Sequence, residues 1–298
     1  MPTLIREITV LQRDAGLEES RISYRMTGCP NGCARPYLGD VGFVGTTLGK
    51  YDVFLGGDTE GTRLNELYAR NVKLEEILAW TYKRFRRVAL VASFQAESLV
   101  LIDLACSLGV NPEVLTLDTG RLHEETHEYI EAVRARYPIR LRILAPDADE
   151  LEAMTGAHGS MQFRRSLALR NECCAVRKVN PLARALEDYD AWITGLRREQ
   201  TPTRASTPVV AADRGHGDIT KVVPLAGWTG EEVWAYLESH GISPHPLYER
   251  GYTSIGCAPC TRATKPGEHE RAGRWWWEGN SDKECLLHPP LERERSVM

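Results

Sequence analysis

Short apolar segments alternate with helical patterns from residue 72 onward, and this alternation limits the possible folds more than any other feature of the chain. Strands are predicted at 88–92, 113–117, 140–144 and 191–194, with a further strand end at 222–225. Helices are predicted at 72–85, 99–108, 124–137 and 230–240. Continuous apolar runs are typical of parallel strands buried on both faces. We therefore expect an α/β fold, with a mostly parallel, Rossmann-like sheet and helices on both of its faces.

The first seventy residues have a different character. Glycine recurs throughout residues 28–61, and a helical pattern begins only after Asn71. This change predicts a small glycine-rich N-terminal appendage at 1–70, followed by a main domain at 71–298.

Composition excludes some classes of function. The 298 residues are 42% apolar, which is enough for a sizeable core, and the net charge of −4 argues against general nucleic-acid binding. No apolar run approaches the ~18 residues of a membrane helix. The N-terminus lacks a signal-peptide core, so we expect a cytoplasmic protein. Thiols stay reduced there, and the eight cysteines are expected to be ligands, nucleophiles or core residues rather than disulfides.

Three predicted loops fall where ligands of parallel sheets bind, at the carboxyl ends of the strands. They begin at Ser93, Asp118 and Gly195. The loop at 93–98 leads from a strand into a helix, where backbone N–H groups favour an anion such as phosphate or sulfate. It lacks the glycines and lysine of a Walker loop, and an ordinary β–α turn stays open as its alternative.

Two arginine-rich segments could hold that anion. Arg197, Arg198 and Arg204 follow a predicted strand end, and arginine forks match phosphate and sulfate oxygens. Arg271 and Arg274 precede three tryptophans at 275–277, which indicates a tail covering the substrate. The alternatives are a solvated basic loop for the first segment and plain core packing for the second.

Cysteines are the strongest chemical signal. Cys173 and Cys174 are adjacent, and Cys257 and Cys260 form a second pair. Two thiolate pairs suit an iron–sulfur cluster better than zinc, because zinc sites usually join C-x-x-C to another such pair or to histidines. Cys285 stands apart and needs a separate role. The H-E-x-x-H match at 123–127 lacks an obvious third ligand motif, and we interpret it as a coincidence.

Residues from about 72 to 288 resemble the iron–sulfur type of adenosine 5′-phosphosulfate (APS) reductase, within the sulfonucleotide (PAPS) reductase family. The matching segments occur in the family's order, at 93–94, 117–122, 172–174, 177–179, 192–198, 251–252, 254–257, 259–262, 273–278 and 283–285. The resemblance implies a fold like that of the adenine nucleotide alpha hydrolases.

The resemblance also implies the site residues. One 4Fe-4S cluster would be held by Cys173, Cys174, Cys257 and Cys260, and the nucleophile would be Cys285 in a catalytic tail at about 266–298. The sulfonucleotide would lie among Ser93, Lys178, Gly195, Arg204, Arg271 and Arg274. Relatives without the cluster usually reduce the 3′-phosphorylated nucleotide (PAPS), so four cluster ligands favour APS.

The implied reaction reduces APS to sulfite and AMP, as in assimilatory sulfate reduction for cysteine biosynthesis. Cys285 would form an S-sulfo intermediate, and thioredoxin would then release sulfite. Homo-oligomerisation stays open. The chain departs from the family pattern at Leu286, where the family usually has glycine, while His288 is kept.

The N-terminal segment resembles the C-terminal end of sulfite or nitrite reductase haemoproteins. The similarity covers 26–36, with shorter matches at 42–45, 55–57 and 61–64, and includes Cys29 and Cys33. The haemoproteins need a second cysteine pair upstream, which this chain does not contain. We therefore expect no sirohaem and no complete second cluster.

Three other functions remain. A PAPS reductase is the closest alternative, and an ATP-cleaving tRNA-thiolating enzyme of the same fold group is a second. An inactive cluster-binding scaffold protein, left without catalysis by Leu286 and the N-terminal fragment, is the third.

Overall fold

The computed structural model describes the side chains of 73–217, 219–279, Glu284 and Leu287, except that of Arg214, and the backbone of three N-terminal strands. The chain divides into two compact units, Met1–Tyr68 and Ala69–Met298. In the first unit, β1 (Tyr24–Thr27) pairs parallel with β2 (Val41–Thr47), which pairs antiparallel with β3 (Lys50–Leu55). Cys29 and Cys33 lie outside the described residues, and the resemblance of 1–70 to a haemoprotein stays a prediction.

The second unit is built on a six-stranded sheet in the order β6-β5-β4-β7-β9-β8. Its strands are β4 (Val88–Val91), β5 (Glu113–Leu117), β6 (Arg140–Leu144), β7 (Ala191–Thr194), β8 (Val210–Asp213) and β9 (Ile219–Val222). All neighbouring strands are parallel except β8 and β9. The mostly parallel sheet predicted from the sequence is confirmed.

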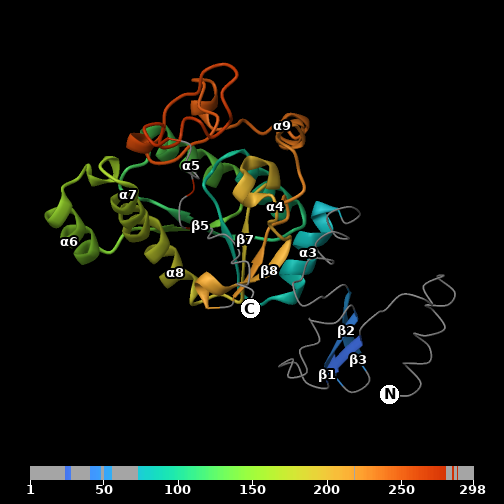
Figure 1. Cartoon of the computed structure of the whole chain (residues 1–298). Coiled ribbons are helices and arrows are strands. Elements are labelled where there is room, and N and C mark those ends of the chain that lie inside the picture. The colour runs from blue at the N-terminus through green and yellow to red at the C-terminus, as the bar shows by residue number, and fades with distance from the viewer. Residues whose placement is uncertain are drawn as a thin grey trace. The chain divides into compact units, whose positions relative to one another are not determined.

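Helices cover both faces of this sheet (Figure 1). On one face lie α3 (Leu74–Arg84), α4 (Ala96–Ser107), α5 (Glu124–Arg136) and α9 (Gly230–Ser239). Successive strand residues point to opposite faces. Leu90 and Ile193 accordingly pack with these helices, whereas Ala89 and Trp192 pack with α8 (Asn180–Leu186) on the other face.

The segment between β6 and β7 contains helices that the sequence analysis did not predict. They are α6 (Ala148–His158), α7 (Leu167–Cys174) and a π-helical stretch, η3 (Ala175–Val179), that joins α7 to α8. Ser166 caps α7, its hydroxyl accepting from Leu169 N at 3.2 Å. Lys178 lies on the π-helical stretch, a feature often found at functional sites.

The sheet has a topological switch point between β4 and β7. The chain passes from β4 through β5 to β6 on one side, and then returns to place β7 on the other side of β4. Loops after β4 and β7 therefore diverge and leave a crevice, where ligands of such sheets bind.

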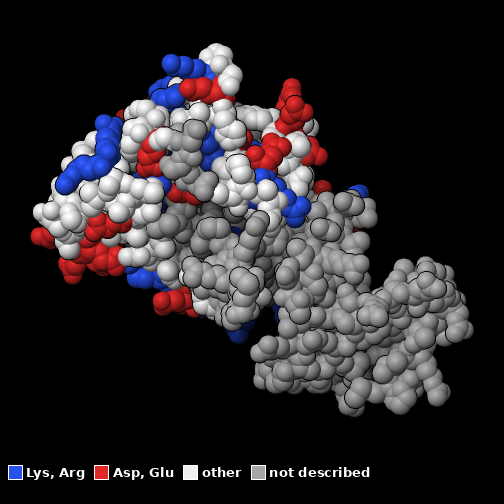
Figure 2. Space-filling view, in the orientation of Figure 1, with Lys and Arg blue, Asp and Glu red and all other residues white. Residues whose placement is uncertain are grey.

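The segment after α9 lies at this end of the sheet, drawn from orange to red in Figure 1. Ala258 N donates to Arg121 O, which attaches the segment to the loop after β5. Acidic and basic side chains are interspersed on the described surface in Figure 2, as expected from the small net charge. Within the described residues, no helix is both long and apolar enough to span a membrane.

Candidate functional site

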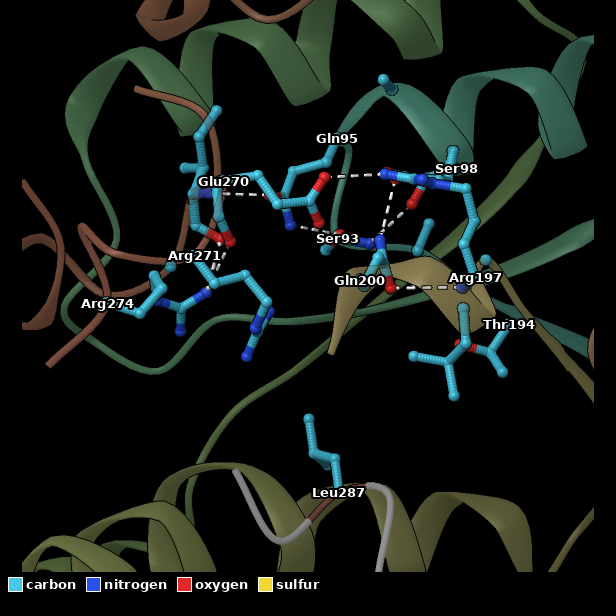
Figure 3. Close-up of a pocket in the computed structure, with 18 of the residues that line it drawn as sticks. Ser93, Gln95, Ser98, Thr194, Arg197, Gln200, Glu270, Arg271, Arg274 and Leu287 are labelled. Carbon is cyan, nitrogen blue, oxygen red and sulfur yellow. Dashed lines mark hydrogen bonds and ion pairs between the residues drawn. The ribbon is translucent and has the colours of Figure 1, made fainter. Parts of the chain in front are cut away.

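A cavity of about 240 Å³ opens at the switch point (Figure 3). Its lining comes from the loops after β4, β5 and β7, from the π-helical stretch and from the C-terminal segment. All six residues that were predicted to bind the substrate line this cavity: Ser93, Lys178, Gly195, Arg204, Arg271 and Arg274. We call this cavity the nucleotide pocket, after the ligand that the family resemblance implies for its residues.

Backbone N–H groups of the loop from β4 to α4 donate hydrogen bonds to side chains of the protein. Ser93 N donates to Ser98 Oγ at 3.1 Å, and Ala96 N donates to the Tyr248 hydroxyl at 3.2 Å. The predicted anion-binding N–H groups are therefore partly used within the protein. Phe94 is fully buried at a φ of 56°, a left-handed conformation that bulky residues rarely adopt and that tends to occur at functional sites.

Gln95 connects this loop to the C-terminal segment. Its side-chain nitrogen donates to Ser93 Oγ at 3.0 Å, and its oxygen accepts from Ile255 N at 2.6 Å. Gln95 had no assigned role in the sequence analysis. Its only signal was its position inside the 93–98 loop.

The contacts of Arg197 do not fit its predicted role in binding an anion. Its guanidinium donates to Glu97 at 2.9 Å, to Glu199 at 2.6 Å and to Glu270 at 3.0 Å, and the residue is 3% exposed. Burial alone would lower the pKa of Arg197, but the carboxylates, Glu97 first, raise it. Because three carboxylates already accept from its guanidinium, Arg197 joins the elements that carry them and has few N–H groups left to bind a further anion.

Gly195 marks a close approach of two elements. A Cβ added there would lie 2.8 Å from Glu97 Cβ, which is shorter than real Cβ contacts. Any larger residue would therefore push the loop after β7 away from α4.

Arg204 and Arg271 meet a carboxylate from the tail. Arg204 donates to Glu284 through Nε at 2.8 Å and Nη2 at 2.7 Å, a bidentate pair. Arg271 Nη2 lies 3.5 Å from the same carboxylate. Glu284 was quoted in the sequence analysis only as part of a family motif, and no charge pattern pointed to its partners. The predicted nucleophile Cys285 follows it but lies outside the described residues, as do Leu286 and His288.

Arg274 has neutral partners instead. Its Nη1 donates to Ile255 O at 3.2 Å and lies 3.4 Å from Ser254 Oγ, while Nε has no partner among the described residues. Its guanidinium carbon lies 4.7 Å from the centre of the Trp275 ring. Gly256 makes room for it, since a Cβ there would lie 2.3 Å from Arg274 Nη2.

A second, smaller cavity adjoins the nucleotide pocket, and all four predicted cluster ligands line it. Cys173 and Cys174 end α7, while Cys257 directly precedes a short 3₁₀ turn, Ala258–Cys260, and Cys260 ends it. The four are buried together with Met154, Phe163 and Trp275. We call this space the thiol cavity. Lys178, Cys257 and Arg274 line both cavities.

The thiol cavity suits an anionic, sulfur-rich group. Four N–H groups on residues that line it have no hydrogen-bond acceptor among the described residues: Arg121 Nη1, Arg177 Nε, Arg274 Nε and Trp275 Nε1. Such buried donors usually have a partner. A single zinc ion would need thiolates converging at about 2.3 Å. No group of three or more His, Cys, Asp or Glu side chains is placed to hold a metal ion in the described part of the chain. The donor set itself, four buried thiols around one space, is of the kind that holds an iron–sulfur cluster.

Positive charge from the π-helical stretch acts on one of these thiols. Burial would raise the pKa of Cys257, but Lys178 and a 3.3 Å contact with Thr119 Oγ1 lower it overall. Burial raises the pKa of Cys260 to about 12. A group that requires thiolates would therefore need compensating positive charge, which the adjoining arginines and lysine supply.

Comparison with known proteins agrees with this geometry. The family model described as phosphoadenosine phosphosulfate reductase domain matches residues 87–263. Similar curated proteins are APS reductases of Burkholderia cepacia (46% identical, covering 75% of this chain and 89% of the relative) and Allochromatium vinosum (41%, covering 78% and 94%). An APS reductase of Pseudomonas aeruginosa is 42% identical, covering 72% of this chain and 81% of the relative.

A solved structure shows the same fold. The phosphoadenylyl-sulfate (PAPS) reductase from Candida auris, in a phosphate complex, superposes with a TM-score of 0.57. It is 24% identical and covers 69% of this chain and 98% of its own. On the extent of the sequence match, the chain belongs to the phosphoadenosine phosphosulfate reductase domain family.

Proposed function

We propose that this protein is an adenylyl-sulfate reductase, an oxidoreductase that converts APS to sulfite and AMP in sulfate assimilation. The single observation that carries the proposal is the adjacency of the two cavities. A cationic nucleotide pocket at the switch point shares three lining residues with a cavity lined by four thiols. Relatives that are 41–46% identical over most of the chain are APS reductases.

The pocket residues would first offset charge repulsion. Both APS and an attacking thiolate are anionic, so a pocket must supply positive charge before they can approach. Lys178, Arg271 and Arg274 line the pocket, and the low exposure of the two arginines to water strengthens their effect. Ser93 and Gly195 would contact the nucleotide from the two loops that diverge at the switch point.

Cys285 would then act as the nucleophile. Its thiolate attacks the sulfur of APS, an S–S bond forms, the bond between sulfur and the phosphate oxygen breaks, and AMP leaves with the electron pair. A dithiol such as thioredoxin attacks the Cys285 sulfur and releases sulfite, and its second thiol then frees Cys285. The dithiol is thereby oxidised to a disulfide and supplies the two electrons. A reducing compartment, the cytoplasm, suits this donor.

Cys173, Cys174, Cys257 and Cys260 would hold one 4Fe-4S cluster, with no sirohaem elsewhere. When bound, this group would shape the local field beside the pocket without having to change its oxidation state. The chain's own contribution is positional. Lys178 would stay between the two cavities, and Arg121, Arg177 and Trp275 would donate to the group.

A PAPS reductase remains the second candidate, because the matching family model carries that substrate's name. The two nucleotides differ by the 3′-phosphate. Four thiols around one cavity favour APS, by the family resemblance described above.

The test is turnover of APS and of PAPS by the as-purified protein with thioredoxin, alongside its iron content and oligomeric mass. We expect sulfite from APS, about four irons per chain, and a sulfite adduct on Cys285 by intact mass when the reductant is omitted. A Cys285→Ser protein that still makes sulfite would refute the mechanism. Absence of any adduct in the iron-loaded wild type would instead support an inactive scaffold.

A further inference from the structure

The tail is attached to the domain at Glu284 by two independent groups of contacts. Its carboxylate accepts from Arg204 Nε and Nη2 and from the Thr201 hydroxyl at 2.9 Å, with Thr203 Oγ1 at 3.3 Å. Its backbone carbonyl accepts from Arg170 Nη1 at 2.9 Å. Together these contacts hold both the side chain and the backbone carbonyl of Glu284.

Arg170 links this attachment to the thiol cavity. It is 1% exposed, lies on α7 three residues before Cys173, and lines the thiol cavity. It also stacks on the Trp275 ring at 4.3 Å and donates to Glu278 at 2.6 Å. A change in the packing of the thiol cavity would therefore be transmitted to the backbone of Glu284.

Leu287 provides a second attachment three residues later. Like Val91 and Leu117, the last residues of β4 and β5, it packs against the buried apolar cluster that includes Leu115. Figure 3 shows its side chain directed into the nucleotide pocket from the side opposite Arg271. The two described tail residues thus flank position 285, one held by charge and the other by apolar contact.

We propose that Glu284 is a positioning residue, whose contacts with Arg204 and Arg170 anchor the tail directly before Cys285, the proposed nucleophile. The inference rests on the proposed function for the identity of the nucleophile. Consecutive Cα atoms are about 3.8 Å apart, so an anchor on the side chain and the carbonyl of Glu284 acts within one residue of the nucleophile. Bringing a nucleophile into register in this way is a large part of the advantage of a bound reaction.

An alternative use of the same contact is competition. Glu284 occupies the fork of Arg204, which the family resemblance assigns to the substrate, and the carboxylate could act as a stand-in for the substrate anion. The two ideas differ in outcome. Removing a positioning carboxylate slows transfer, whereas removing a competitor tightens nucleotide binding.

The first measurement is the rate at which a neutral alkylating reagent labels Cys285 in the iron-loaded protein, followed by peptide mass. Glu284→Gln and Arg204→Gln change the local charge in opposite senses, and would change the thiolate fraction in opposite directions. Both lose the same attachment. We expect both variants to label at least about tenfold faster than the wild type. Opposite changes in rate, or no change in either, would overturn the proposal.

The second measurement separates transfer from binding. In Glu284→Gln we expect AMP release in a single turnover of APS to fall at least about 30-fold, with AMP affinity within about threefold of wild type. Tighter AMP binding with unchanged transfer would replace positioning by competition. Glu268→Gln is the matched control, because it breaks another bidentate pair, with Arg262 at 2.8 and 2.9 Å, outside the pocket lining. It should label at the wild-type rate.

The two readouts keep this inference distinct from the proposed function. Labelling of Cys285 needs no turnover. If the wild type is inactive on APS but both variants still label faster than it does, the attachment at Glu284 is supported and the proposed reaction is refuted. Iron content and thermal unfolding of each variant identify any that fail to fold. Leu287→Ala, which weakens the second attachment, then supplies an independent variant, and we expect it to label several-fold faster.

Discussion

Two sides of the nucleotide pocket carry arginines with opposite surroundings. On one side Arg197 is surrounded by Glu97, Glu199 and Glu270, a group that we call the ion-pair side. On the other side Arg274 has a carbonyl, a hydroxyl and an indole ring as neighbours, and we call it the cation side. Figure 3 shows Arg197 and Arg274 on opposite sides of the same space.

The difference shows that arginine near a pocket is poor evidence for anion binding until its partners are known. An arginine already neutralised by carboxylates holds elements together, here α4, the loop after β7 and the C-terminal segment. An arginine with neutral partners keeps its field directed at the pocket. We therefore expect the ion-pair side to hold the fold together and the cation side to stabilise negative charge in the pocket.

The largest effect is expected on the ion-pair side. Arg197→Gln would leave Glu97 and Glu270 near each other without their shared cation, and breaking a buried pair costs about 3–5 kcal/mol. We expect the free energy of unfolding to fall by about 3 kcal/mol, measured by urea denaturation of the as-purified protein.

Arg198→Gln is the matched control for this prediction. Arg198 is the next residue in the same loop, and its Nε donates only to the Thr207 carbonyl among the described residues. Its loss should cost no more than about 1 kcal/mol. Equal destabilisation by the two variants would mean that the ion-pair side does not exist as a unit.

The second effect is expected on the cation side and concerns catalysis. Arg274→Gln removes a positive charge that lines both cavities, and the loss of one preorganised donor typically costs about 100-fold or more in rate. We expect kcat/KM for APS to fall about 100-fold, while urea denaturation shows a much smaller change than for Arg197→Gln. If Arg274→Gln is as strongly destabilised as Arg197→Gln and keeps its activity, the roles expected for the ion-pair side and the cation side are wrong.

The sequence was sufficient for the bounds of three parallel strands. The strands predicted at 113–117, 140–144 and 191–194 coincide with β5, β6 and β7. The buried strand β7 is a short segment between turn signals, whereas β6 is a mostly exposed edge strand in which polar and apolar residues alternate. The strand end predicted at 222–225 is wrong in its bounds, since β9 covers Ile219–Val222. Antiparallel β8 was missed because Val210–Asp213 is short and ends in a charge.

The site could be predicted only as far as residue types and resemblance reach. Six pocket residues and four thiols were named from the sequence, and the structure places each group around one cavity. The partners of the arginines could not be predicted, because Arg197–Glu97 and Arg204–Glu284 join residues 100 and 80 positions apart. Pairing at that distance depends on the fold, and no local pattern encodes it.

The smallest effect tests the contact that joins the two loops at the switch point. Gly195→Ala places a Cβ 2.8 Å from Glu97 Cβ, and neither atom is the end of a flexible side chain. Relief requires a shift of the loop after β7 relative to α4, and such overpacking costs about 1–3 kcal/mol. Because Glu97 is also a partner of Arg197, the shift would loosen the ion-pair side first.

Gly156→Ala gives a control of opposite sign. Gly156 lies within α6, has no atom within 4 Å of an added Cβ, and has a backbone that alanine can adopt. Its replacement should therefore stabilise the protein by about 0.4–1 kcal/mol, mainly by restricting the unfolded chain. Urea denaturation of both variants measures the difference. If Gly195→Ala were as stable as Gly156→Ala, the loop after β7 would tolerate displacement, and the ion-pair side would owe its position to the carboxylates alone.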